Sequence, residues 1–151
     1  TLLNKYDVRW VIVGGEAVIY YGYVRLTGDV DFFYANDDDN INKLWMALND
    51  FWDNNIPGNI QKADLKKPGY FIQFGIPPNR IDLMNKIDGV KIDEVWDDRV
   101  KETFKSAPAK MDVYFISLDH LIKNKSKSKR PKDKEDLKYL KASKENNQNY
   151  D

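Results

Sequence analysis

The sequence predicts a single domain of mixed helices and strands, the α+β class. Two observations lead to this prediction. Short runs of β-branched and aromatic residues alternate along the chain with segments whose apolar residues recur at helical spacing. The 151 residues, 42% of them hydrophobic, can bury one substantial core but not two. We therefore expect one domain over residues 1–143 and a disordered polar tail over residues 144–151.

The charge and cysteine content narrow the class of protein. The 24 basic and 24 acidic residues give a formal net charge of zero, so no overall field indicates a nucleic-acid or membrane partner. The chain has no cysteine, which excludes disulfides and thiolate chemistry and suits a cytoplasmic protein. The longest apolar runs are far too short to span a membrane.

The first predicted elements are a strand, a glycine turn and a helix. Val8 to Val13 (VRWVIV) is a β-branched and aromatic run that ends at Gly14-Gly15, as a buried strand does before a tight turn. A helix is predicted from Glu16 to about Tyr23, where apolar residues recur at helical spacing. Gly22 is well placed to end this helix.

An alternating strand is predicted next, at Asp29 to Tyr34 (DVDFFY). Side chains alternate between the two faces of a strand, so Asp29 and Asp31 point to the same face while the apolar residues between and after them point to the other. Two carboxylates therefore share one side of this strand.

A long amphipathic helix follows. Its apolar stripe is formed by Ile41, Leu44, Trp45, Leu48, Phe51 and Trp52. Asp37, Asp38 and Asp39 precede this stripe, where carboxylates can cap the open amides of a helix and favour its dipole. We interpret the three acids as caps and not as a metal site.

The middle of the chain predicts a loop and two strands. The segment from Asn54 to Pro68 has the composition of a loop. Gly69 to Gly75 (GYFIQFG) and Arg80 to Met84 (RIDLM) are predicted strands, joined by a turn at Pro77-Pro78. Asp82 is therefore a lone acid within an apolar strand.

The last third of the chain predicts a short helix, a strand and two further helices. The short helix is expected at residues 92–100 and the strand at Met111 to Ile116. Ser117 is placed to cap a helix that begins near Leu118, and Pro131 suits the first position of a last helix. A basic run lies between these two points and consists of Lys123, Lys125, Lys127, Lys129, Arg130 and Lys132.

One kind of site explains the Gly14-Gly15 turn, the Asp29-Val30-Asp31 strand and the isolated Asp82 together. Mg²⁺ or Mn²⁺ takes oxygen ligands, and carboxylates at i and i+2 of a strand point into one small volume. Asp82, from a neighbouring strand, can close the cluster. Two such ions can stabilise the attacking and leaving oxygens of a phosphoryl displacement, while amides at a glycine turn bind a triphosphate. The sequence therefore predicts a divalent-metal site for nucleotide transfer.

These residues resemble the signature of the nucleotidyltransferase superfamily that includes DNA polymerase β. In that signature, Gly-Gly or Gly-Ser is followed about a helix later by Asp-apolar-Asp. The chain looks most like a small bacterial branch that includes nucleotidyltransferase antitoxins, abortive-infection nucleotidyltransferases and lincosamide nucleotidyltransferase-like proteins. Members of that branch often show Gly-Gly-x-Ala and then Arg-x-Thr-x-Asp-x-Asp. This chain has Gly14-Gly15-Glu16-Ala17 and Arg25-Leu26-Thr27-Gly28-Asp29-Val30-Asp31, and the resemblance extends from Val11 to Leu140.

The resemblance implies a fold and a metal-binding set. The fold would be the nucleotidyltransferase fold, a small mixed sheet with helices on one face. Asp29, Asp31 and Asp82 would be the catalytic residues and would bind Mg²⁺ or Mn²⁺, with Asp82 also helping to deprotonate the acceptor hydroxyl. The activity would be transfer of a nucleoside monophosphate from a nucleoside triphosphate such as ATP. A side chain of a cognate toxin, a tRNA end or a small molecule could be the acceptor.

The resemblance also implies a nucleotide-binding set. Its members are Gly14, Gly15, Arg25 and Lys123. Lys125 and Arg130 lie in the same basic run and could reach phosphate as well. The second glycine stands where many members of the superfamily have serine, so a hydroxyl contact to phosphate is missing at this turn.

Other interpretations of the same residues remain open. Arg80 lies two residues before Asp82 on the same face of a strand, so it could be a structural ion-pair partner in place of a metal. The basic run could be a solvated surface or a phosphate-binding surface for RNA. The whole chain could act as an antitoxin that neutralises a partner by contact, with a weak or vestigial site, or as an RNA-binding domain. We assign no role to His120.

Overall fold

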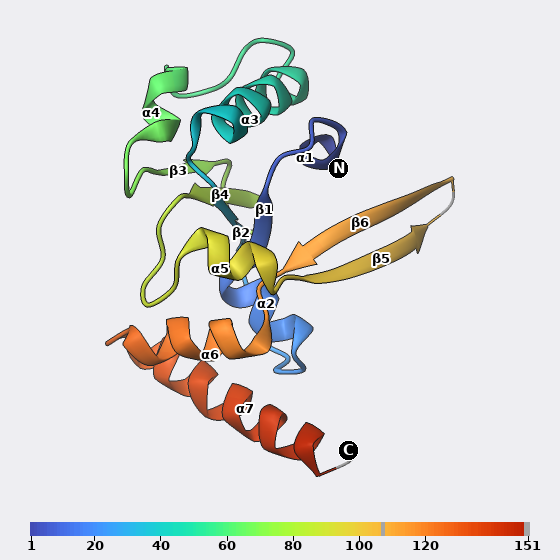
Figure 1. Ribbon diagram of the computed structural model, residues 1–151, viewed down its shortest axis with the longest axis vertical. Coiled ribbons are helices and arrows are strands. Elements are labelled where there is room, and N and C mark those ends of the chain that lie inside the picture. Colours follow the sequence, from blue (N-terminus) through green and yellow to red (C-terminus); the bar gives the residue numbers. More distant parts are fainter. Residues whose placement is uncertain (107, 150–151) are drawn as a thin grey trace.

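A computed structural model describes residues 1–106 and 108–149 and contains a six-stranded mixed sheet with helices on both sides (Figure 1). The elements in chain order are α1 (Leu2–Lys5), β1 (Trp10–Val13), α2 (Gly14–Tyr20), β2 (Asp29–Tyr34), α3 (Asp38–Phe51), α4 (Lys62–Lys66), β3 (Phe71–Phe74), β4 (Arg80–Met84), α5 (Ile92–Asp97), β5 (Val100–Ser106), β6 (Ala109–Phe115), α6 (Leu118–Lys127) and α7 (Pro131–Gln148). Within the described ranges, no helix has the length and apolar character needed to cross a bilayer.

The strand order is β3-β4-β2-β1-β6-β5, which places β1 and β2 at the centre of the sheet. The pairs β2–β4 and β1–β6 are parallel, and the other neighbouring pairs are antiparallel. The central strands are joined by α2, which begins directly where β1 ends. The predicted mixed sheet is therefore confirmed.

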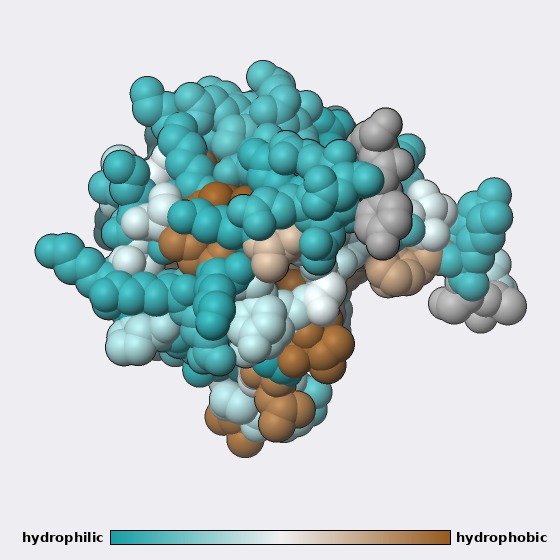
Figure 2. Space-filling view, turned by 90° about the horizontal axis from the view of Figure 1, so that it is seen from below, coloured by the Kyte–Doolittle hydropathy of each residue, from teal (hydrophilic) through white to brown (hydrophobic). Residues whose placement is uncertain are grey.

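The helices cover both faces of the sheet, so the expectation of helices on one face is wrong. All four residues of β1 are buried, which requires cover on either side of this strand. On one face, α1 and α3 pack over Phe32, Ile81 and Leu83. On the opposite face, α6 and the start of α7 lie over the carboxyl-bearing side of β2 and β4. The surface on the α7 side is largely hydrophilic (Figure 2), because this helix exposes a series of lysines.

Several predicted helix boundaries are confirmed by local contacts. Asp37 caps α3 by accepting a hydrogen bond from the Asn40 amide, and Ser117 caps α6 in the same way through the His120 amide. Gly22 follows α2 with a φ of 102°, a conformation that favours glycine. Pro131 is the first residue of α7.

The helix expected from Glu16 to about Tyr23 runs instead from Gly14 to Tyr20, so the two glycines form its first residues and not a separate turn. Three further segments differ in kind from the sequence prediction. The predicted loop over residues 54–68 contains α4, a single turn with a capping box between Gln61 and Asp64 that is too short to show helical periodicity. β5 was not predicted because three of its seven residues are charged; it forms by pairing along its whole length with β6 in a projecting hairpin (Figure 1). The predicted disordered tail is helical as far as Gln148, while residues 150 and 151 lie outside the described residues.

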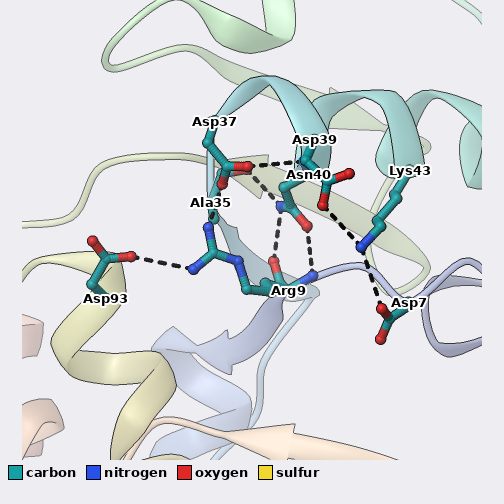
Figure 3. Close-up of polar contacts among 8 residues, drawn as sticks. All are labelled: Asp7, Arg9, Ala35, Asp37, Asp39, Asn40, Lys43 and Asp93. Carbon is teal, nitrogen blue, oxygen red and sulfur yellow. Dashed lines mark hydrogen bonds and ion pairs between the residues drawn. The ribbon is translucent and has the colours of Figure 1, made fainter.

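A buried asparagine joins the first turn of α3 to the sheet (Figure 3). The Asn40 amide group donates to the carbonyls of Ala35 (2.6 Å) and Arg9 (3.2 Å), and its Oδ1 accepts from the Arg9 amide (2.7 Å). These backbone groups lie just outside β1 and β2, beyond the ends of both strand ladders. The Arg9 carbonyl also accepts from the Ala35 amide (3.3 Å), so Asn40 supplies the partners that the Arg9 amide and the Ala35 carbonyl would otherwise lack.

Replacing Asn40 by Ala should lower the free energy of unfolding by roughly 2–4 kcal/mol, because the Arg9 amide and the Ala35 carbonyl lose their partner in a buried place. Lys43→Ala, on the same helix, is the matched control. It removes only surface ion pairs with Asp7 and Asp39, which solvent screens, and should lower the free energy of unfolding far less. Urea unfolding of the three proteins measures both values, and equal losses in the two variants would contradict this assignment.

Candidate metal and nucleotide site

The three predicted carboxylates lie together on neighbouring parallel strands. Asp29 and Asp31 are in β2, Asp82 is in β4, and Asp31 and Asp82 are direct register partners. Each of the three offers a carboxylate oxygen, and these oxygens all lie within 4.8 Å of one another. Direct pairing of β2 with β4 produces this cluster because residues in register on one face project side by side.

Gly14 brings the start of α2 against the same cluster. β1 ends at Val13, which pairs with Asp31 across the antiparallel β1–β2 ladder. A Cβ at Gly14 would lie 1.9 Å from Oδ2 of Asp31, and the φ of this residue is 65°. Both facts require glycine here. At Gly15, a Cβ would lie 2.8 Å from Oγ1 of Thr27, so the second glycine makes room for the loop that leads into β2.

Two of the acids are held by polar neighbours. Arg80 Nε donates to Oδ1 of Asp82 (2.9 Å), and Arg80 Nη2 donates to Oδ2 of Asp82 (3.2 Å) and to Oδ2 of Asp29. The Thr27 hydroxyl donates to Oδ1 of Asp29 (3.1 Å). Burial opposes ionisation of Asp29, but the hydrogen bonds from Thr27 and Arg80 outweigh it and keep its pKa below the ordinary value.

Asp31 is in the opposite electrostatic situation. Burial, together with the nearby charges of Asp29 and Asp82, raises its pKa from 3.8 to about 7. The side chain of Lys125 opposes this rise only in part. The cluster therefore carries more negative charge than its neighbours compensate, and the excess is concentrated at Asp31.

The residues present fit a divalent cation. All three donors are hard carboxylate oxygens, which Mg²⁺ and Mn²⁺ prefer, and their spacing requires only small side-chain movements to place them around one ion. The raised pKa of Asp31 marks the point where a positive charge would be most stabilising. The cluster opens into a cleft of about 440 Å³, which provides space for phosphate groups beside the acids.

The far wall of this cleft is formed by α6 and α7. Lys125, Arg130 and Asp133 line it opposite Gly14 and the three acids. Lys125 is buried, and its Nζ contacts Asp133 (2.7 Å) and Asp136 (3.1 Å). The ion pairs with Lys125 and Arg130 and the hydrogen bond from Ser128 outweigh burial and lower the pKa of Asp133 to about 2.

The predicted nucleotide-binding residues are placed differently from one another. Gly14 lies at the cleft beside Asp31, and Gly15 follows it at the start of α2. Arg25 pairs with Asp136, with Nε and Oδ1 separated by 3.0 Å, and so joins the loop before β2 to α7. Lys123 is exposed and lines a different pocket, so the structure does not bring it to the acids.

Sequence reasoning favoured Lys123 over Lys125 and did not identify Thr27, Asp133 or Asp136. A signal for Lys125 was present, because it lies four residues after the buried Leu121 and so on the inner side of α6. Asp133 and Asp136 likewise share the inner side of α7 with Leu140. Acidic residues at the apolar positions of a helix indicate buried ion pairs. In α7 this pattern is hard to recognise because many lysines surround the two acids.

This mixed sheet, with three carboxylates on the adjacent parallel strands β2 and β4 beside the Gly-Gly start of α2, defines a nucleotidyltransferase-type domain. The chain belongs to the family described as "Nucleotidyltransferase of unknown function (DUF6036)", whose model matches residues 1–149. A comparison with curated proteins found no significant match. The family membership establishes the nucleotidyltransferase class and leaves the nucleotide and the acceptor to be determined.

Replacing Asp31 by Asn should stabilise the metal-free protein at alkaline pH. A carboxyl whose folded-state pKa is raised binds its proton more tightly in the folded state, so stability falls as the pH rises from about 4 to 7. Roughly three pKa units set an upper limit of about 4 kcal/mol for this loss. In EDTA, Asp31→Asn should exceed the wild type in stability at pH 8 and match it near pH 4. Unfolding curves with the same pH dependence would contradict the raised pKa.

Proposed function

We propose that this domain transfers a nucleoside monophosphate from a nucleoside triphosphate to a hydroxyl acceptor and releases pyrophosphate. The observation that carries the proposal is the cluster of Asp29, Asp31 and Asp82, whose oxygens lie within 4.8 Å of one another on a domain of the nucleotidyltransferase family. A divalent cation held by these carboxylates would stabilise the charge that develops during phosphoryl transfer.

The walls of the cleft suit the two ends of this reaction. Gly14 presents backbone without a side chain directly beside Asp31, so a phosphate can approach the carboxylates closely there. Lys125 and Arg130 lie across the cleft and supply positive charge for the triphosphate. Asp82 is buried next to Asp31, where we assign it to the metal and to the deprotonation of the acceptor hydroxyl.

The identities of the nucleotide and of the acceptor depend on more than the three carboxylates. We propose ATP as the nucleoside triphosphate. A side chain of a cognate toxin, a tRNA end and a small molecule all remain candidate acceptors, because each presents a hydroxyl and the metal site alone does not choose between them. The acceptor has to approach through the open side of the cleft, where Lys86 and Asp88 are exposed.

A second candidate function is neutralisation of a partner protein by contact alone. Two observations favour it. Arg80 already compensates part of the charge of Asp29 and Asp82, as it would in a vestigial site. The projecting β5–β6 hairpin exposes Phe104 and Met111, which are register partners and could contact another protein. Under this alternative, a partner copurifies in stoichiometric amount and neutralisation survives the loss of the carboxylates.

Calorimetric titration with each non-hydrolysable nucleoside triphosphate tests the proposal. Magnesium-dependent binding should occur in the wild type and weaken by more than roughly a hundredfold in the double variant Asp29→Asn plus Asp31→Asn. Asp88→Asn is the matched control, because it removes an exposed acid from the same cleft but outside the cluster, and its binding should stay within about threefold of wild type. If no triphosphate binds in the presence of Mg²⁺ or Mn²⁺, the transferase proposal fails and neutralisation by contact takes its place.

A further inference from the structure

Arg80 bridges two acids of the cluster, Asp29 and Asp82. It lies two residues before Asp82 on β4, so both side chains project from the same face of the sheet. Its register partner on the parallel strand β2 is Asp29. The pairing of β2 with β4 that brings the three acids together therefore also places the Arg80 guanidinium beside them.

The hydrogen bonds of the cluster leave its acids unequal. Both oxygens of Asp82 accept from Arg80, and Oδ2 of Asp82 also accepts from the Gln73 amide (3.3 Å). Asp29 accepts from Arg80 at one oxygen and from Thr27 at the other. Among the described residues, Asp31 accepts no side-chain hydrogen bond from any residue other than a neighbouring aspartate. The guanidinium thus covers two of the three acids.

A guanidinium and a metal ion compete for these oxygens, because a carboxylate oxygen has two lone pairs and Oδ2 of Asp82 already accepts from both Arg80 and Gln73. A divalent cation binds carboxylate oxygens directly, at roughly 2.0–2.6 Å, in the space into which the Arg80 N–H groups point. If Arg80 were absent, the partly buried carboxylates would repel one another and the side chains would move apart. One residue can therefore preserve the spacing of the acids in the ion-free protein and compete with the ion that they would bind.

We propose that Arg80 is a displaceable counter-ion of the metal site. In the ion-free protein its guanidinium positions Asp29 and Asp82, and it leaves their oxygens when a divalent ion binds. Its side chain is 27% exposed and lines the open cleft, so the guanidinium can move toward solvent without disturbing the core. Arg80 is a positioning residue in this proposal, which rests on the metal-binding part of the proposed function.

Titration with Mn²⁺ alone, followed by the electron paramagnetic resonance signal of the free ion, tests the competition. Arg80→Gln should bind Mn²⁺ about tenfold more tightly than the wild type, because the competing charged hydrogen bonds are gone. Lys86→Gln removes an equal charge from the same cleft without touching the three acids, and its affinity should change less than about threefold.

The variant Arg80→Lys separates competition by the planar guanidinium group from the effect of its positive charge alone. Lysine keeps the positive charge but cannot donate to Asp29 and Asp82 from one planar group. Its Mn²⁺ affinity should therefore rise by about threefold or more, whereas a purely coulombic effect would leave it at the wild-type value. Arg80→Lys also keeps the test decisive if Arg80→Gln does not fold without metal.

Thermal unfolding supplies the second measurement. In EDTA, Arg80→Gln should have a lower Tm than the wild type, and saturating Mn²⁺ should remove most of the difference. A lower Tm at every Mn²⁺ concentration, with unchanged or weaker Mn²⁺ binding in Arg80→Gln and Arg80→Lys, would show that Arg80 is merely structural and overturn the proposal. Because these titrations contain no nucleotide, failure of nucleotide binding leaves the result on Arg80 standing, and the converse also holds.

Discussion

The in-register parallel pairing of β2 with β4 is the constraint on which the rest of the structure depends. It places Asp31 beside Asp82 and Asp29 beside Arg80, and so brings three carboxylates and one guanidinium into one small volume. A shift of one residue in this register would move β4's acid to the opposite, apolar face of the sheet. The centre of the sheet must be rigid to maintain the register, which is consistent with the complete burial of β1 next to β2.

The repulsion between the acids is distributed unequally over their surroundings. Asp29 and Asp82 accept hydrogen bonds from Arg80, whereas the pKa of Asp31 is raised to about 7 and, among the described residues, no cationic side chain donates to it. In the ion-free state of a preorganised cation site, carboxylates that repel one another are generally held close together. On the other side of the cleft, buried ion pairs between Lys125 and α7 fix the wall that faces the acids. The excess negative charge of the three acids thus faces a wall in which Lys125 and Arg130 are paired with acids of α7, with space between the two sides for phosphates.

Periodicity alone predicted much of the candidate site but little of its surroundings. The alternation of β2 predicted that Asp29 and Asp31 share a face, and Asp82 was recognisable as a lone acid in an apolar strand. Whether Arg80 or a metal ion compensates the negative charge of Asp82 depends on which strand pairs with β4. No local sequence pattern specifies that strand. To predict that Lys125 and not Lys123 lines the cleft, one must know how α6 is rotated against the sheet. To predict β5, one must know that it pairs with β6. The family match adds the enzyme class, while the roles of individual residues remain predictions.

Anomalous diffraction from crystals grown with Mn²⁺ and a non-hydrolysable nucleoside triphosphate tests the central claim most directly. The account predicts a manganese peak in direct ligand contact with Asp29, Asp31 and Asp82, with the triphosphate extending from it past Gly14 toward Lys125. A manganese peak away from these carboxylates, or an intact Arg80 bridge between Asp29 and Asp82 while the nucleotide is bound elsewhere, would contradict it.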